Sequence, residues 1–317
     1  MAREQTKCIT SIGGQALVEG IMMRGPKKTE VAVRQSDGTI SLQQMETQPL
    51  GAKYPFLKWP FLRGIAALVD SLGAGYKALA YSVEKSGLEE DEEPSKFDRW
   101  VQEKFGDKMM GAIMTASTIL GVLLAIVLFF ALPTVLFNLV RDYISGPAIN
   151  VWRSPVEGIM RILIFLIYII LVSRMPEIHR LFEYHGAEHK TIFCYENNEE
   201  LTVENVRRHS RFHPRCGTSF IVIMLILGIL IGFFIPFSNP VLRTVVKLLC
   251  IPIVVGLGYE MIRFCGRNDN WLTHIVSAPG MWVQHITTKE PDDSMIEVAI
   301  AAMQEVIPEN GEDKIVL

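Results

Sequence analysis

Residues 109–137 read MMGAIMTASTILGVLLAIVLFFALPTVLF and contain no charged side chain. A helix of about 20 apolar residues crosses the hydrocarbon core of a bilayer, because its backbone polar groups then bond to one another inside the helix. This stretch exceeds that length, and its one proline, Pro133, lies near its end. We therefore predict that it spans a membrane and that the chain folds as a mainly α-helical membrane protein.

Three further stretches are apolar enough for the same prediction. Residues 217–237 carry no charge, and the charges of residues 241–264 lie near the two ends, where long side chains reach the polar interface. Residues 156–175 are the weakest candidate because their uncharged part is short, and a buried helix of a soluble domain is the alternative. We predict four transmembrane helices in all, at 109–137, 156–175, 217–237 and 241–264.

Composition excludes some classes of protein. The chain has 317 residues and a net charge of −3, so it lacks the basic surplus of a nucleic-acid-binding protein. The first 20 residues include charged side chains and no long apolar run, and we expect no signal peptide. An odd number of scattered cysteines indicates free thiols or metal ligands in a reducing compartment; they are Cys8, Cys194, Cys216, Cys250 and Cys265.

The Lys and Arg content of the short connections predicts the orientation. Residues 174–216 carry seven basic side chains, and residues 138–155 carry two. Basic loops stay on the cytosolic side, so the 174–216 connection is predicted to be cytosolic. With four spans, both termini are then cytosolic in a multi-pass protein of the cytoplasmic membrane. Arg243, near the opposite surface, is mild evidence for the reverse.

Three cytosolic segments remain: 1–56, 176–216 and 265–317. Together they have the size of one small domain, and we expect them to pack into a composite α+β domain. The first segment is predicted to be β-rich, the second is a loop rich in His and Cys, and the third forms the C-terminal part.

Local patterns predict elements within these segments. EVAVRQ and TISLQ alternate around Ser36-Asp37-Gly38, which is typical of a β-hairpin. Residues 281–287 read as a short strand. After Asp292, residues 295–307 keep apolar side chains on one helical face and predict an amphipathic helix.

Residues 57–85 form an amphipathic segment of uncertain placement. Arg63, Asp70, Lys77 and Glu84 recur every seven residues, nearly on one line of a helix. A narrow charged stripe on an apolar helix favours an interfacial or re-entrant helix. A fifth span with a polar seam is the alternative. The acidic run 89–93 reads as a solvated linker.

The sequence His185-Gly-Ala-Glu188-His189 is the strongest chemical signal. On a helix, His185 and His189 are four residues apart and share a face, as two ligands of one metal ion must. The order H-x-x-E-H matches a metalloprotease signature in which the Glu activates water. An ordinary pair of surface histidines is the alternative.

A second cluster, His213-Pro-Arg-Cys216, immediately precedes the third predicted span. Both clusters then lie at the same membrane surface. We predict a Zn²⁺ site made by His185, His189 and Cys216, with His213 as a fourth or replacement ligand and Glu188 as the catalytic base. An inert thiol at a helix start is the alternative for Cys216.

Two other features have open interpretations. Glu260 is either a third metal ligand or the partner of a basic residue in an ion pair. The glycine-rich stretch from Gly13 to Pro26 is either a tight-turn scaffold or a loop that offers Glu19 or Arg24 to a ligand.

Four motifs, taken in order, resemble those of the YqhQ-like family of uncharacterised bacterial membrane proteins. They are GGQALVEGIMMRGP, YHGAEHKTI, HPRCGTSF, and QHITTKEPDD followed by EVAIAAM. The resemblance extends over nearly the whole chain. It implies a protein of the bacterial cytoplasmic membrane with a domain of unknown function. Such proteins have been labelled predicted metal-dependent enzymes.

The leading functional hypothesis is therefore a bacterial inner-membrane, zinc-dependent hydrolase, although a Cys ligand departs from the metalloprotease pattern. The first alternative is a non-enzymatic membrane factor with a structural metal. Its cytosolic domain would bind protein-translocation or membrane-biogenesis partners. A channel or transporter is the second alternative, which the few charges deep in the spans disfavour. We expect a membrane-protein partner or a homo-oligomer, and no nucleic acid.

Overall fold

The computed structural model describes residues 8–46, 48–87, 107–268 and 270–316. The chain divides into two compact units. The first, here called the sheet unit, comprises Met1–Glu89, Ile169–Met224 and Val255–Leu317. The second, the helical unit, comprises Glu90–Tyr168 and Leu225–Val254. The acidic run 89–93, predicted to be a linker, lies outside the described residues.

A four-stranded antiparallel sheet forms the centre of the sheet unit. Its strands follow one another in chain order: β2 (Gly13–Leu17), β3 (Gly20–Arg24), β4 (Thr29–Arg34) and β5 (Ile40–Met45). The predicted hairpin is confirmed, since β4 pairs with β5 and Gly38 turns between them with a φ of 85°. A positive φ suits glycine because it has no Cβ.

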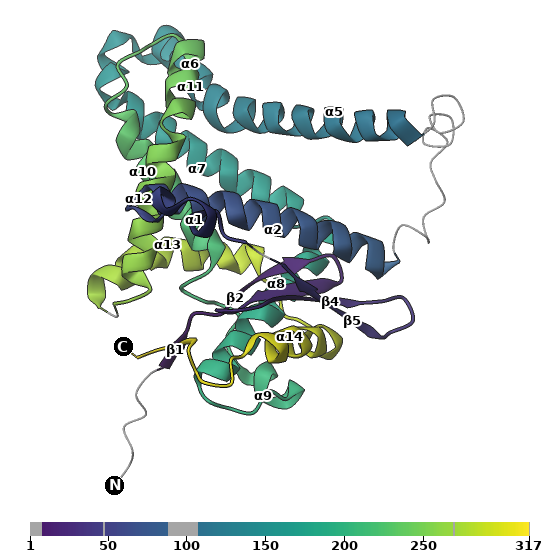
Figure 1. Ribbon diagram of the computed structural model, residues 1–317. Coiled ribbons are helices and arrows are strands. Elements are labelled where there is room, and N and C mark those ends of the chain that lie inside the picture. The colour runs from purple at the N-terminus through teal and green to yellow at the C-terminus, as the bar shows by residue number, and fades with distance from the viewer. Residues whose placement is uncertain (1–7, 47, 88–106, 269, 317) are drawn as a thin grey trace. The chain divides into compact units, whose positions relative to one another are not determined.

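Both faces of this sheet are covered by helices. Ile21, Met23 and Ala32 pack against α8 (Pro176–Glu196) and α14 (Asp293–Val306). Met22, Val31 and Val33 point the other way and pack with Ala78 of α2 (Leu62–Ser86). Successive side chains of a strand alternate between faces, so an almost wholly apolar β3 needs a cover on each side. Figure 1 shows the resulting layers, with α2 along one side of the sheet and α14 along the other.

Helix α2 covers most of the segment predicted as amphipathic. It follows α1 (Leu50–Lys53) and a 3₁₀ turn, η1 (Pro55–Lys58). Its inner side has small residues where it meets the sheet: a Cβ on Gly75 would lie 2.6 Å from the side-chain oxygen of Gln15. Its outer side exposes Val69, Leu72, Tyr76 and Leu79. Among the described residues, α2 is not one of the helices apolar enough to span a membrane.

The C-terminal part of the sheet unit corrects one prediction. Residues 281–287 are not a strand but the last turns of α13 (Trp271–Thr287). A capping box between Asn270 and Thr273 starts this helix, and the local β pattern does not outweigh it. The helix predicted after Asp292 is confirmed as α14, since the Asp292 carboxylate accepts a hydrogen bond from the Met295 backbone at 2.9 Å. A short helix, α9 (Val203–Arg208), and a pair of strands, β1 (Cys8–Thr10) and β6 (Lys314–Val316), complete the unit.

The described chain contains two helical stretches long and apolar enough to cross a membrane. The first, Ala116–Ile144, has 29 residues and runs through α5 (Asp107–Ile126), the π-turns η2 (Val127–Ala131) and η3 (Arg141–Ser145), and α6 (Leu132–Val140) between them. The second, Pro147–Val172, has 26 residues and consists of η4 (Pro147–Trp152) and α7 (Arg153–Val172). These stretches correspond to the first two predicted spans.

The third and fourth predicted spans are not confirmed as continuous helices. Helix α10 (Gly217–Gly232) has only 16 residues. The fourth is broken into α11 (Pro240–Leu249) and α12 (Ile251–Cys265), which are bent by 45°. Pro252 follows the break directly, and a proline ring clashes with the carbonyl four residues earlier. The described residues thus contain two candidate spans, or three if the bent pair counts as one.

Arg243 and Lys247 were expected to reach toward a membrane interface, yet the helical unit buries both. Arg243 is 1% exposed and Lys247 is 6% exposed. Both contact one carboxylate oxygen of Glu157, at 3.0 Å from the Arg243 Nε and 2.6 Å from the Lys247 Nζ. Burial is tolerated because the opposite charge is adjacent, a pairing that sequence spacing did not reveal.

Candidate metal centre

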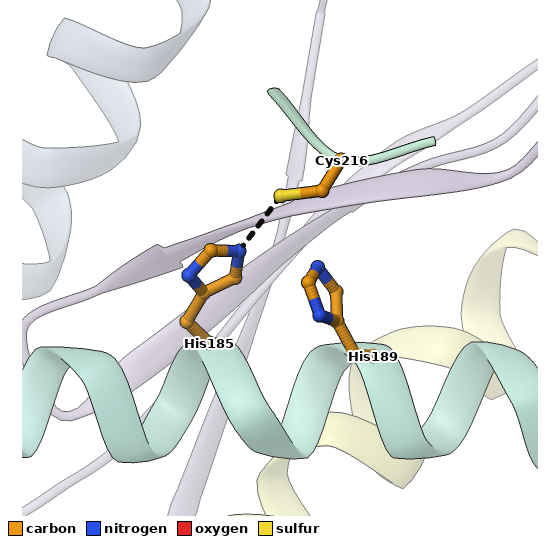
Figure 2. A group of neighbouring side chains, drawn as sticks. All are labelled: His185, His189 and Cys216. Carbon is orange, nitrogen blue, oxygen red and sulfur yellow. Dashed lines mark hydrogen bonds between the residues drawn. The ribbon is translucent and has the colours of Figure 1, made fainter. Parts of the chain in front are cut away.

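Helix α8 holds both histidines of the HGAEH motif on one side. Their ring centroids are 4.4 Å apart, because residues four apart on a helix are neighbours. In Figure 2 both rings rise from α8 toward Cys216, which lies on a separate segment of the chain.

Cys216 comes from the residue immediately before α10. Its Sγ lies 3.1 Å from Nε2 of His185. The ligand atoms of His185, His189 and Cys216 all lie within 4.8 Å of one another. The structure therefore brings together three side chains of the predicted site, from two segments that the sequence places on either side of a connection.

Backbone carbonyls fix the orientation of both rings. The Nδ1 atom of His185 lies 2.8 Å from the carbonyl oxygen of Thr287, and that of His189 lies 2.6 Å from the carbonyl oxygen of Arg211. A carbonyl only accepts, so each Nδ1 carries the proton and each Nε2 carries a lone pair. Histidines that bind metals commonly donate their other nitrogen in this way.

The Nε2 atom of His189 is a buried polar atom without a hydrogen-bond partner among the described residues. Such an orphan is costly unless another group meets it. The pKa of His189 is lowered to about 4, chiefly by burial; Cys216 opposes this shift, and the neighbouring His185 and His213 add to it, so the ring is neutral at pH 7. A neutral imidazole with an inward lone pair is the form that binds a metal ion.

The Cys216 thiol is also shifted toward the form that binds metals. Burial raises its pKa, but interactions with His189 and Thr218 outweigh burial and hold the pKa below its ordinary value. Thiolate is the ligand form of cysteine. Two imidazole nitrogens and one cysteine sulfur are a donor set suited to Zn²⁺, and three protein ligands leave a fourth position.

Glu188 lies beside this group and not within it. Its carboxylate is buried and accepts a hydrogen bond from the backbone N–H of Gly14 at 3.0 Å. Burial raises the pKa of Glu188 to about 7, and the nearby Cys216 raises it as well. A Cβ on Gly14 would lie 2.8 Å from the carboxyl carbon of Glu188, so the glycine permits this close approach.

His213, predicted as a fourth or replacement ligand, lies near the group but faces elsewhere. Its ring centroid is 5.5 Å from that of His189, and its Nε2 lies 3.8 Å from a carboxylate oxygen of Glu196. The Gln284 side chain holds the His213 backbone from both sides, at 2.8 Å each. His213 is thus a neighbour of His185, His189 and Cys216, positioned by Gln284 and Glu196.

Glu260 and the glycine-rich stretch each had two interpretations from the sequence. Glu260 forms an ion pair with Arg63, which supports the ion-pair alternative and names the partner. The glycine-rich stretch forms the β2–β3 hairpin, in which Glu19 pairs with Arg180. This arrangement agrees with a turn scaffold, and its direct link to the site is the Gly14 backbone.

A second group of possible ligands is formed by Cys194, Glu199 and His209. Burial raises the pKa of Cys194 to about 11, so this thiol stays protonated, and Glu199 contacts His209 at 3.2 Å. The group suits a metal less well than the first. Sequence reasoning missed the Thr287 and Arg211 carbonyls, because backbone acceptors leave no trace in residue type.

Comparison with known proteins places the chain in a family. Residues 59–309 match the family described as "Protein of unknown function (DUF1385)". The chain is 35% identical, over 298 residues, to "Uncharacterized protein YqhQ" of Bacillus subtilis (strain 168), covering 93% of this chain and 92% of that protein. No solved structure matches. With the family model matching most of its length and a relative matching almost end to end, the chain belongs to the DUF1385, or YqhQ-like, family.

Proposed function

We propose that this protein is a membrane-bound, zinc-dependent hydrolase whose metal site consists of His185, His189 and Cys216. One observation carries the proposal. Both imidazoles donate Nδ1–H to backbone carbonyls, so their Nε2 lone pairs converge near the Cys216 sulfur. Zinc bound there supplies Lewis-acid polarisation and a water of lowered pKa.

The residues around the three proposed ligands would orient the imidazole rings and transfer protons. Thr287 and Arg211 hold the ring tautomers through their carbonyls. Glu188 holds a proton at its carboxylate with a pKa of about 7, which suits a group that accepts and releases protons near neutral pH. The Gly14 N–H aims this carboxylate. Zinc has no redox states, so a zinc ion held here would serve hydrolysis and not redox chemistry.

The basic connection 174–216 supports a cytosolic position for this site. All three proposed ligands lie within or at the end of that connection, next to helix α10. We infer that the substrate is reached from the cytosol, at or near the membrane surface, and that both termini share this side.

Metal content tests the proposal. Full-length protein, purified in detergent after growth with added zinc, should contain about one equivalent of zinc by elemental analysis. Each substitution His185→Ala, His189→Ala and Cys216→Ala should reduce that content at least tenfold, because losing one of three ligands opens the site. Cys194→Ala, in the second group, is the matched control and should retain the metal. Metal-free wild-type protein would contradict the proposal.

A second candidate is a non-catalytic membrane factor in which the zinc only stabilises the fold. The near-complete burial of His189, 1% exposed, and of Cys216, 9% exposed, favours it, since a closed site is typical of structural zinc. In that case the sheet unit would bind a membrane-protein partner. The Glu188→Gln experiment in the Discussion separates the two candidates.

A further inference from the structure

A second site lies in the sheet unit, in a broad open cavity of about 650 Å³. Its walls are α1, η1, the first turns of α2, the end of β3 and the last turns of α12. None of the residues that line it belongs to the His/Cys group, so the two sites are independent.

Positive charge dominates the lining. Arg24, Lys58, Arg63 and Arg263 contribute cations, and Asp70 is the one carboxylate among the lining residues. Asp70 is already engaged, because both of its oxygens accept from the Leu50 backbone N–H at 3.1 Å. The four cations outnumber the two carboxylates nearby, Asp70 and the adjacent Glu260, and the net positive charge attracts an anion.

Three of the four cations are available to a ligand. Arg63 is held by the carboxylate of Glu260 through two nitrogens. Arg24, Lys58 and Arg263 make no ion pair or hydrogen bond through their side chains with any described residue. Guanidinium groups bind phosphate oxygens with two parallel hydrogen bonds, and a lysine adds a point charge.

The cavity is also partly apolar and lies close to exposed aromatic side chains. Leu57, Ala66 and Ala67 form part of its wall. Beside it in the chain, Tyr54 is 43% exposed and Trp59 is 66% exposed. Aromatic side chains of this kind concentrate where membrane lipid meets water. A ligand with an acidic head and an apolar body matches both parts of the lining.

We propose that this cavity binds a phosphate group, through Arg24, Arg263 and Lys58, and that the phosphate belongs to an acidic membrane lipid. Helix α12, which contributes Arg263 and Tyr259, is half of the bent apolar pair that counts as a candidate span. If that pair spans the membrane, the cationic cavity lies at the polar end of the span, where lipid headgroups are found. A free phosphate is the other source of the same chemistry.

Thermal unfolding of the full-length protein in neutral detergent tests the proposal. The probes are dihexanoyl phosphatidic acid, dihexanoyl phosphatidylcholine and inorganic phosphate, titrated separately. Phosphatidic acid should raise the unfolding temperature in a saturable way, because a ligand that binds only the folded state stabilises it. Phosphatidylcholine should have little effect. Equal shifts with the two lipids would overturn the proposal.

Substitutions locate the site. Arg24→Gln and Arg263→Gln should each weaken the apparent affinity for phosphatidic acid by about tenfold or more, as expected for a lost charge-assisted hydrogen bond. Arg267→Gln is the matched control: Arg267 is exposed, lies four residues beyond Arg263 and does not line the cavity. Wild-type affinity in Arg24→Gln and Arg263→Gln would refute the assignment.

Two further readouts keep the result clear. An unchanged unfolding temperature of the variants in the absence of lipid shows that the sheet unit is folded, and this control holds whether or not the protein binds zinc. If Arg263→Gln does not fold, Lys58→Gln replaces it, since Lys58 is exposed. Inorganic phosphate that gives the same saturable shift and competes with the lipid would support the site with free phosphate as its ligand.

Discussion

The Nε2 atom of His185 lies 3.1 Å from the Cys216 sulfur, although 31 residues separate them in the chain. The arrangement depends on a third segment, since the Thr287 carbonyl at the end of α13 orients the His185 ring. Three parts of the sheet unit therefore have to be in place before the candidate metal centre exists. A substitution in any one of these segments should therefore change the geometry at the other two.

Glu188→Gln tests whether the site is catalytic. The amide keeps the size of the side chain and its acceptor for the Gly14 N–H but cannot accept a proton. If the protein is a hydrolase, the variant should bind zinc normally, and its hydrolysis rate should fall by a factor of about 10²–10⁴. In a complementation assay it should then fail to rescue a deletion strain. Full rescue by a folded, zinc-loaded variant would contradict a catalytic role for Glu188 and favour a structural role for the metal.

The same substitution has a pH signature in metal-free protein. The folded-state pKa of Glu188 is raised from 4.5 to about 7, so the folded state binds more protons than the unfolded state between these values. Wild-type stability should therefore fall as pH rises from about 4.5 to about 7. Glu188→Gln cannot bind this proton, so the difference between its unfolding temperature and that of the wild type should increase in favour of the variant as pH rises from about 4.5 to about 7. Parallel thermal melts at pH 5 and pH 8 provide the measurement.

Gly14→Ala should disturb the site from the sheet side. The added Cβ would lie 2.8 Å from the carboxyl carbon of Glu188 and 2.9 Å from the Met22 carbonyl oxygen. We expect a loss of about 1–3 kcal/mol in the free energy of unfolding, as for other overpacked positions. Gly13→Ala is the matched control, because nothing lies within 4 Å of its Cβ position. Equal stability of the two variants would show that β2 moves away from α8 at no cost.

Glu157→Gln should destabilise the helical unit. Two buried cations, Arg243 and Lys247, share the Glu157 carboxylate, and removing its charge leaves both uncompensated. Losing one partner of a buried ion pair costs about 3–5 kcal/mol. Asp142→Asn is the control, since Asp142 is exposed and forms an ion pair with the adjacent Arg141. Detergent-solubilised protein followed by thermal unfolding would show a drop for the first variant alone.

The predicted orientation can be tested by labelling. A membrane-impermeant thiol reagent applied to intact cells should modify a cysteine introduced at Asn150, an exposed residue in η4 at the start of the second candidate span. A cysteine at Asn197, exposed at the end of α8, should react only after the cells are opened. The reverse pattern would place the His/Cys group outside the cytosol.

The sequence predicted the parts of the site that depend on local periodicity. His185 and His189 share a helix face because of their spacing, and Cys216 was predicted from its cluster with His213 immediately before the third predicted span. The contacts with the Thr287 and Arg211 carbonyls could not be predicted from the sequence, because every residue type carries a backbone carbonyl.

Fold prediction failed where tertiary contacts outweigh local pattern. Residues 281–287 alternate like a strand but continue a helix started by the Asn270 capping box. The fourth apolar stretch looked continuous, yet it bends before Pro252. Arg243 and Lys247 were predicted to lie at the interface. Their common partner, Glu157, lies 86 residues before Arg243 in the chain, and no local sequence pattern reveals a contact at that separation.

Glycine at position 186 determines how widely this site can recur among proteins. A Cβ there would lie 2.0 Å from the Lys289 carbonyl oxygen, and the Lys289 N–H donates to the Phe182 carbonyl at 2.8 Å, so α8 and the chain after α13 touch backbone to backbone. Any side chain would push that segment away, and with it the Thr287 carbonyl that orients His185. A genome search for this architecture should therefore require H-G-x-E-H, and chains with another residue at the second position should lack the centre even when every ligand is retained.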